Sequence, residues 1–304
     1  MKISTNEYFQ KMAGYITEQQ SNIAQSQLKL SKGDSLSSAS ENTRVATASL
    51  SLKSAVERQE AYVSNLKLLD MKLNETEVLA ISARDQLTRI REILIRSANQ
   101  TYSDQDRVVM GREVSIIKDN LFSMMNSTDS SGNYIFSGIK NRTKPFQKNE
   151  EGIIEFLGDN SPVNIQVGPG QSMRSNSNSQ DIFPNFRRDG SGAVVEVFAA
   201  IESMEAAVAS SNMAAIQTGL ADIDVIANGV DTFIVSVGSR RKIIESRIDV
   251  AEERKLAMTT LYSNYRDLDY GKTVSILSSQ VLALEAAQSS IAKVSQLTLF
   301  NYIR

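Results

Sequence analysis

The sequence predicts a mainly α-helical protein. Its N- and C-terminal halves form a long antiparallel helical hairpin, similar to a coiled coil, with a small β-rich module inserted at the tip. Two observations predict this fold. Apolar residues recur at steps of three and four through most of both halves, as on one face of a helix. All four prolines lie between residues 145 and 184, in a region that has the glycine-bounded, alternating pattern of short strands.

The two ends of the chain carry apolar rows at helical spacing. The N-terminal row consists of Phe9, Met12, Ile16, Ile23 and Leu30. The C-terminal row consists of Val274, Leu277, Val281, Leu284, Ile291, Val294 and Leu297, and Phe300 follows it. Each row predicts a helix with one apolar face.

Both terminal helices are poor in charge. Residues 1–31 hold five charged side chains, and residues 271–300 hold three. A surface helix normally carries lysines and glutamates on its solvated face, whereas small uncharged residues predominate here. We therefore expect protein to contact these helices on several sides, with the two apolar rows as an assembly interface. The alternative is that the two helices simply pair within one monomer. Such a pair would leave a solvent-exposed side on each helix, where charged residues are normally found.

The longest regular pattern runs from Tyr62 to Ser97. Its positions alternate steps of four and three: Tyr62, Leu66, Leu69, Leu73, Thr76, Ala80, Ala83, Leu87, Ile90, Leu94 and Ser97. This pattern predicts one long helix of the hairpin. A second helix is predicted after Ser103, because Ser103 and Asp106 resemble a capping box with Asp in place of Glu. Its apolar row is Met110, Val114, Ile117, Leu121, Met124 and Thr128.

The pattern changes between residues 132 and 191. Residues 132–138, 153–157 and 163–167 are short apolar runs bounded by glycines, which predicts strands. Helical spacing returns at Val194, breaks near Asn212, and continues towards Tyr270. The expected domains are residues 1–42 with 268–304 as the terminal helices, residues 43–131 with 192–267 as the long-helix bundle, and residues 132–191 as an outer β-rich module.

Composition argues against several function classes. The chain has no Cys and no His, so it lacks thiolate metal ligands and the commonest general base. A net charge of −2 does not suit a nucleic-acid protein. The N-terminus lacks the apolar run of a signal peptide, and no apolar stretch is long enough to insert into a membrane. Gly271-Lys272-Thr273 lacks the upstream glycine of a phosphate loop. We expect no catalytic residues, no cofactor and no metal.

Several short motifs resemble the flagellin superfamily. They are Lys2-Ile3-Ser4-Thr5-Asn6, Leu30-Ser31-Lys32-Gly33, and Ser97-Ala98-Asn99-Gln100-Thr101 followed by Ser103-Asp104-Gln105-Asp106-Arg107. Within that superfamily, Gly132-Asn133-Tyr134-Ile135-Phe136-Ser137-Gly138 and the ending Leu297-Thr298-Leu299-Phe300 are similar to the hook-associated proteins of the hook–filament junction. The chain departs from the family pattern after Gly33. The family usually has basic residues and a Pro-Ser-Asp-Asp-Pro-like segment there, and this chain has Asp34-Ser35 and Ser38-Ala39-Ser40-Glu41-Asn42.

The resemblance implies a structural role in the bacterial flagellum, outside the cell. The terminal helices would line the inner tube of the axial structure in a ring or tube of identical subunits. The implied partners are other copies of the chain, another hook-associated protein, flagellin, a flagellar export chaperone and the type III export apparatus, which exports subunits without a cleaved signal. The implied function is to join hook to filament.

The sequence leaves two alternative functions open. A flagellin, the filament subunit, would share the terminal helices, although the Tyr134-Ile135-Phe136-Ser137-Gly138 run and the C-terminal ending disfavour it. An enzyme or ligand-binding domain is disfavoured by the absence of His and Cys and by the uniform helical repeat.

Overall fold

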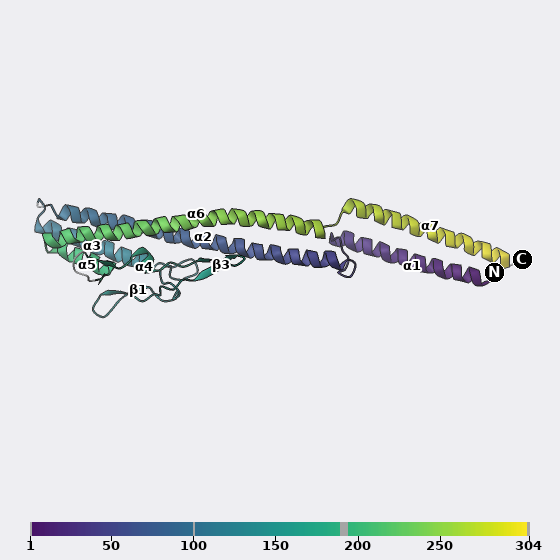
Figure 1. Cartoon of the computed structure of the whole chain (residues 1–304), viewed down its shortest axis with the longest axis horizontal. Helices are drawn as coiled ribbons and strands as arrows, with labels where there is room; N and C mark the ends of the chain where they lie inside the picture. The colour runs from purple at the N-terminus through teal and green to yellow at the C-terminus, as the bar shows by residue number, and fades with distance from the viewer. Residues whose placement is uncertain (1, 100, 189–193, 303–304) are drawn as a thin grey trace. The chain divides into compact units, whose positions relative to one another are not determined.

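Figure 1 shows a computed structural model of the chain. It describes residues 2–99, 101–188 and 194–302, with side chains described from Glu7 to Ser295 within those ranges. The described residues form seven helices and six short strands. The helices are α1 (Lys2–Lys32), α2 (Thr43–Ser97), α3 (Asp104–Met125), α4 (Ser179–Ile182), α5 (Val197–Ala209), α6 (Met213–Arg266) and α7 (Tyr270–Tyr302). The prediction of a mainly α-helical fold with a small β module is confirmed.

The chain divides into two compact units. Unit 1 comprises Met1–Gln59 and Glu253–Arg304, and unit 2 comprises Glu60–Glu252. Unit 1 therefore combines α1 and α7 with the adjoining ends of α2 and α6, while unit 2 holds the rest of those two long helices and everything between them. The three-part division expected from the sequence stays a prediction.

In unit 2, α2 and α6 run antiparallel. The ion pairs between the two helices show which residues lie opposite one another. Positions late in α2 pair with positions early in α6, and the reverse holds at the other end. The pairs are Arg91 with Asp224 at 2.6 Å, Arg84 with Asp231 at 2.8 Å, Glu77 with Arg241 at 2.7 Å, and Lys67 with Glu252 at 2.6 Å. Most of these side chains are substantially exposed, so the pairs order the hairpin more than they stabilise it.

The stability of the hairpin comes from its buried apolar rows. Every position of the row predicted in α2 is buried except Tyr62, which is half-buried. The facing row in α6 is Ile216, Ile223, Ile226, Val230, Phe233, Val237 and Ile244, all at 5% exposure or less. Complete burial of an aliphatic side chain of this size stabilises a fold by about 1.5–3 kcal/mol. These two rows therefore form the central core of unit 2.

Helices α3 and α5 pack together beside the hairpin. The capping box predicted at the start of α3 is present, because the Ser103 hydroxyl accepts from the backbone NH of Asp106 while the Asp106 carboxylate accepts from that of Ser103. Gly111 of α3 lies against Ala209 of α5, where an added Cβ would sit 3.1 Å from the Ala209 Cβ. Glycine at this position therefore lets the two helices approach closely.

The β module consists of three two-stranded antiparallel sheets. β1 (Phe146–Lys148) pairs with β2 (Ile154–Phe156), β3 (Asn164–Gly168) with β4 (Gln171–Arg174), and β5 (Phe186–Arg187) with β6 (Val194–Val195). β2 falls inside the run 153–157 predicted as a strand, and β3 overlaps the run 163–167 and ends one residue later. The strand expected at residues 132–138 is wrong, because that segment makes only isolated bridges from Tyr134 to Thr128 and from Ser137 to Asn178.

The glycines at the ends of residues 132–138 account for this correction. Gly132 and Gly138 have φ values of +78° and +71°, outside the extended region. At Gly138, an added Cβ would lie 1.7 Å from the carbonyl oxygen of Asp159. The segment is therefore a turn that passes close to the neighbouring backbone. The glycine spacing that marked the ends of a strand in the sequence instead marks tight turns.

An aromatic cluster joins the module to the helices. The Phe198 ring of α5 lies 5.0 Å from Phe146, 6.0 Å from Phe183 and 6.3 Å from Phe122, all in edge-to-face geometry. Such pairs add to the free energy of simple burial. The module is thus part of the same continuous core as α3 and α5.

Candidate assembly interface

The candidate interface lies in unit 1, where short polar segments end one helix and begin the next. Gly33 ends α1 with a φ of +71°, and its NH donates to the Lys29 carbonyl oxygen at 2.8 Å. Asn42 precedes α2, and its side-chain oxygen accepts from the Val45 NH at 3.2 Å. Before α7, the Asp269 carboxylate accepts from the Lys272 NH at 3.0 Å. These residues fix the helix boundaries.

The α1–α2 connection is bound to the α6–α7 connection by backbone hydrogen bonds. The Ser35 NH donates to the Arg266 carbonyl oxygen at 2.7 Å, and the Leu268 NH donates to the Gly33 carbonyl oxygen at 3.0 Å. The Asp34 carboxylate also accepts from the Arg266 Nε at 2.7 Å. This hydrogen bond raises the pKa of Arg266 above its ordinary value. Asp34 differs from the residue that the family pattern has at this position. In this chain its carboxylate helps to join the α1–α2 connection to the α6–α7 connection.

A second ion pair joins the C-terminal end of α1 to the segment before α2. Lys29 pairs with Glu41, whose carboxylate also accepts from the NH and hydroxyl of Ser37. Burial opposes the charged form of Glu41, but these hydrogen bonds outweigh it and hold its pKa below the ordinary value. The divergent 34–42 segment therefore has a defined structure.

The apolar rows of α1 and α7 meet within one chain. The five α1 residues of the predicted interface, Phe9, Met12, Ile16, Ile23 and Leu30, are all half-buried. The α7 residues Leu277, Leu284, Ile291 and Val294 are half-buried as well. Between the helices, the Ser26 hydroxyl donates to the Gln280 side-chain oxygen at 2.9 Å. The intramolecular pairing of the two helices, the simpler of the two expectations, is thus present.

Other members of the predicted interface are not covered by this pairing. Val274 and Val281 are 49% and 38% exposed. Leu297 and Phe300 lie outside the residues whose side chains the structure describes. The assignment of all these residues to contacts between subunits stays a prediction.

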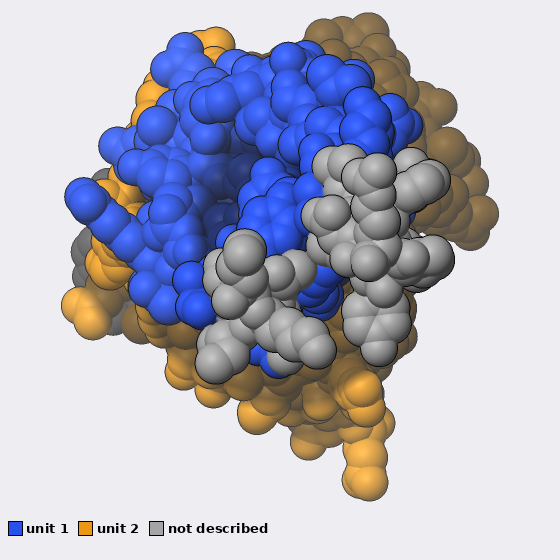
Figure 2. Space-filling model, turned by 90° about the vertical axis from the view of Figure 1, so that its right-hand side faces the viewer, with its two compact units in different colours: residues 1–59, 253–304 blue, residues 60–252 orange. Residues whose placement is uncertain are grey.

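The packing of α1 against α7 does not give unit 1 a hydrophobic core of buried large side chains among the described residues. Among the described side chains of unit 1, Ala287 is the only buried apolar one, and the other buried ones are Ser26, Gln59 and Thr273. Two helices alone can bury only one face of each. The exposed side chains of unit 1 therefore include apolar residues of both helices. Figure 2 draws unit 1 in blue.

Sequence periodicity missed several exposed apolar residues on the remaining faces. On α1 these are Tyr8, Tyr15 and Leu28, at 40–42% exposure, and on α7 they are Ile276 at 42% and Leu282 at 67%. They lie outside the single row that steps of three and four select. The near absence of charge on both helices was the signal that could have identified them.

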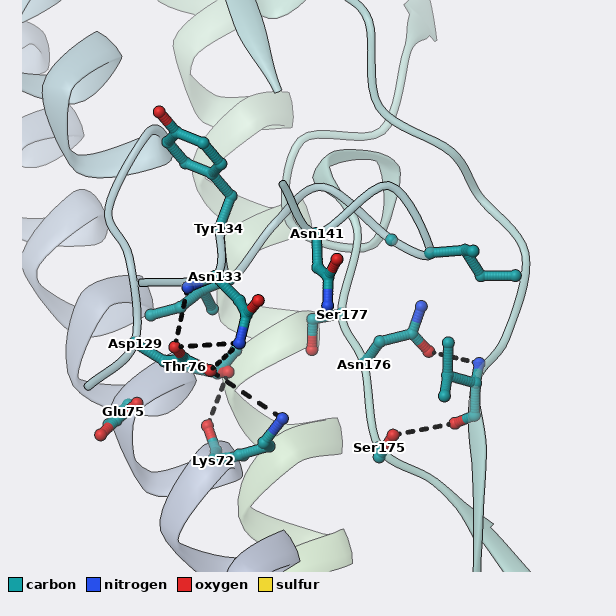
Figure 3. Close-up of a pocket in the computed structure, with 14 residues that line it drawn as sticks. Lys72, Glu75, Thr76, Asp129, Asn133, Tyr134, Asn141, Ser175, Asn176 and Ser177 are labelled. Carbon is teal, nitrogen blue, oxygen red and sulfur yellow. Dashed lines mark hydrogen bonds and ion pairs between the residues drawn. The ribbon is translucent and has the colours of Figure 1, made fainter. Parts of the chain in front are cut away.

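Unit 2 has a small polar pocket beside α2. It is lined by Lys72 and Thr76 of α2 and by Asp129, Asn133 and Ser177 of the segments beside it, as Figure 3 shows. The Asp129 carboxylate accepts from the NH groups of Ser131 and Asn133 at 2.9 Å and lies 3.9 Å from the Lys72 ammonium. This carboxylate therefore holds the turn at residues 129–133 in place.

Within the described ranges, no helix combines the length and apolar character needed to cross a membrane. The same ranges hold no group of three or more potential metal-ligand side chains.

The comparisons with known proteins agree with this architecture. Residues 3–141 match the family described as the bacterial flagellin N-terminal helical region. Flagellar hook-associated protein 3 of Escherichia coli strain K12 is 25% identical, with 99% of both chains covered. Its counterpart from Salmonella typhimurium strain LT2 is 23% identical, with 100% of both chains covered. The chain is therefore similar to hook-associated protein 3 over its whole length, and its N-terminal part matches the flagellin helical region.

Solved structures of hook-associated proteins share the fold. A structure from Vibrio parahaemolyticus, assigned as a flagellar hook-associated protein, has a TM-score of 0.67 and 26% identity, and it covers 75% of this chain and 100% of its own. Hook-associated protein 3 of Legionella pneumophila has a TM-score of 0.62 and 17% identity, with 70% and 97% covered. The resemblance to hook-associated protein 3 expected from the sequence is confirmed. Flagellin is less supported, because both full-length relatives are hook-associated protein 3.

Proposed function

We propose that this chain is a structural component of the bacterial flagellum that joins the hook to the filament. The full-length match to hook-associated protein 3 carries the proposal. The structure adds a physical reason for assembly, since α1 and α7 bury one face of each helix and leave further apolar side chains exposed. The role is mechanical rather than catalytic.

The terminal helices make the contacts between subunits. The outward-facing interface residues are Tyr8, Tyr15, Leu28, Ile276 and Leu282, together with the exposed Val274 and Val281 of the predicted set. Burial of an exposed leucine or isoleucine stabilises an interface by about 1.5–3 kcal/mol. Because these helices carry few charges, such burial meets little opposition from charge desolvation.

Assembly takes place outside the cell, among the axial proteins of the flagellum. Copies of this chain form a ring or tube, bounded on one side by another hook-associated protein and on the other by flagellin. An export chaperone covers the apolar terminal helices before export through the type III apparatus. Such a partner is expected physically, because exposed apolar helices at high concentration favour unspecific association.

A complementation experiment tests the proposal. Cells that lack this protein should carry hooks without filaments and release flagellin into the medium, as seen by electron microscopy and immunoblotting. The wild-type gene should restore filaments. Leu282→Asp should not, because it places a charge in the subunit interface, although this 67% exposed side chain contributes little to the isolated fold.

Leu256→Asp is the matched control. Leu256 lies in α6 and is 68% exposed, so the same substitution should leave filament attachment intact. Full complementation by Leu282→Asp would contradict the role of the outer α7 face. Attached filaments in the deletion strain would contradict the proposed function itself. The flagellin alternative has its own test, since a flagellin polymerises into long filaments under salting-out conditions and this chain should not.

A further inference from the structure

A second hollow in unit 2 has an unusual balance of charge. It has a volume of about 420 Å³, opens to solvent, and lies between the β4–α4 region and the middle of α6. Its charged lining residues are Arg174, Asp181 and Arg240. The lining of the hollow therefore contains two guanidinium groups and one carboxylate. The hollow has room for a group much larger than one water molecule.

The single carboxylate is already engaged by its neighbours. The Asp181 Oδ2 accepts from the Arg174 Nη2 at 2.7 Å and from the Asn178 NH at 3.1 Å. The Asp181 Oδ1 accepts from the Arg174 Nη1 at 3.4 Å. This arrangement is a two-pronged Arg–carboxylate pair that also caps α4. Asp181 is thus committed to Arg174 and to the end of the helix.

Arg240 is left without a partner of its own. Its Nε is enclosed by protein and makes no hydrogen bond, and the structure shows no ion pair to its guanidinium among the described residues. Burial disfavours its charge, repulsion by Arg174 disfavours it further, and Asp181 offsets only part of this. The pKa of Arg240 accordingly lies below its ordinary value. A half-buried cation beside a like charge is a costly arrangement unless an anion comes to it.

The rest of the lining suits an anion with several oxygens. The side chains of Ser236 and Gln180 line the same hollow, and neither makes a hydrogen bond within the described part of the chain. Both can donate to an acceptor oxygen. Guanidinium groups match the geometry of carboxylate and phosphate, whose oxygens accept parallel hydrogen bonds. Chloride is a single atom, so it has no pair of oxygens that could accept parallel hydrogen bonds from a guanidinium group.

We propose that this hollow is a binding site for an oxyanion, a carboxylate or phosphate group, held by Arg240 with Arg174 beside it. The bound anion supplies the negative charge that the pocket lacks. The site lies in unit 2, apart from the terminal helices, and does not depend on the proposed role at the junction.

Thermal unfolding of the full chain tests the proposal. At constant ionic strength, replacing chloride with millimolar inorganic phosphate or with acetate should raise the melting temperature of the wild type by a few degrees. A response to both anions indicates a general oxyanion site, and a response to one alone identifies whether phosphate or carboxylate is preferred. Equal melting temperatures in all three salts would overturn the proposal.

Two variants separate specific binding from a general salt effect. Arg240→Gln should melt no lower than the wild type in chloride, because it removes an uncompensated charge, and it should lose the response to the anions. Arg254→Gln, an exposed arginine of the same helix, should respond as the wild type does. If Arg240→Gln kept the full response, the anion would bind elsewhere. Isothermal titration of the wild type with phosphate gives a direct check that needs no variant.

Discussion

At the residue scale, burial decides which ion pairs stabilise the protein. Arg188 reaches Asp222 through three hydrogen-bond contacts of 2.6–3.2 Å, and Asp222 is 3% exposed. In contrast, Arg91 and Asp224 lie 2.6 Å apart with both side chains about half exposed. A buried carboxylate that loses its partner cannot be hydrated, whereas an exposed carboxylate can hydrogen-bond to water in place of the partner.

Arg188→Met should therefore destabilise unit 2 by about 2 kcal/mol, because it leaves Asp222 charged and buried. Urea unfolding followed by circular dichroism measures this difference. Arg91→Met is the control and should change the midpoint little, since water replaces the lost partner. Equal effects of the two substitutions would show that Asp222 is more accessible than its position suggests.

The Asp129 turn should make stability depend on pH. Burial opposes the charge of Asp129, but hydrogen bonds from the backbone NH groups of Asn133 and Ser131 outweigh it and hold its pKa below the ordinary value. A lowered carboxylate pKa contributes stability above the unfolded pKa of about 3.9, and this contribution is lost as pH falls through the folded pKa.

Asp129→Asn should accordingly cost stability at neutral pH, and the difference from the wild type should shrink as the pH falls below about 4. Urea midpoints of both proteins, measured at neutral pH and at successive acidic values, provide the test. A difference that stayed constant across that range would mean that the charge of Asp129 contributes nothing.

At the scale of elements, α1 and α7 form a pair with a shallow core. Leu284 is half-buried on α7, on the row that faces α1, while Leu282 on the same helix is 67% exposed. The two positions differ in surroundings but not in residue type or helix. They can therefore separate the pairing of the helices in one chain from contacts between chains.

Leu284→Asp should weaken the α1–α7 pair by roughly 2 kcal/mol, because the new carboxylate would be partly desolvated with no cation opposite. Limited proteolysis of the isolated chain should then cut both terminal helices sooner, while the urea midpoint of unit 2 stays unchanged. Leu282→Asp, the control, should be cut at the wild-type rate. Earlier unfolding of unit 2 in Leu284→Asp would contradict this separation.

At the scale of the whole molecule, the two units differ in how much apolar surface they bury. Among the described residues, unit 2 contains all the buried large apolar side chains, while the buried side chains of unit 1 are one alanine and three polar residues. Local opening is easiest where few apolar contacts hold the backbone. A subunit whose terminal helices are completed by neighbouring copies would have this distribution.

Hydrogen exchange of the isolated chain should therefore show faster exchange in α1 and α7 than in α2 between residues 60 and 97. Assembled subunits should lose that difference, because neighbouring chains then cover the terminal helices. Mass spectrometry of peptides from both states measures it. Equal protection of α1 and α2 in the isolated chain would mean that the pair is stable without partners.

The sequence by itself determined the helical character of both halves, the buried row of α2 and the capping box of α3. These features depend on local geometry, since a period of 3.6 residues and a side chain three positions away are properties of one segment. The charge-poor ends indicate contact with protein on several sides of the terminal helices, and this stays a prediction. Motifs along the chain indicated the resemblance to hook-associated proteins.

Only the tertiary structure decided which segments meet. It placed the apolar row of α1 against that of α7 in one chain, made a turn of residues 132–138, and brought Arg174 and Arg240 to one hollow. None of this is encoded in a local period. The α1–α7 contacts and the Arg174–Arg240 hollow join residues far apart in the chain and depend on how whole elements pack. Periodicity tells which face of a helix is apolar, and packing alone tells what covers it.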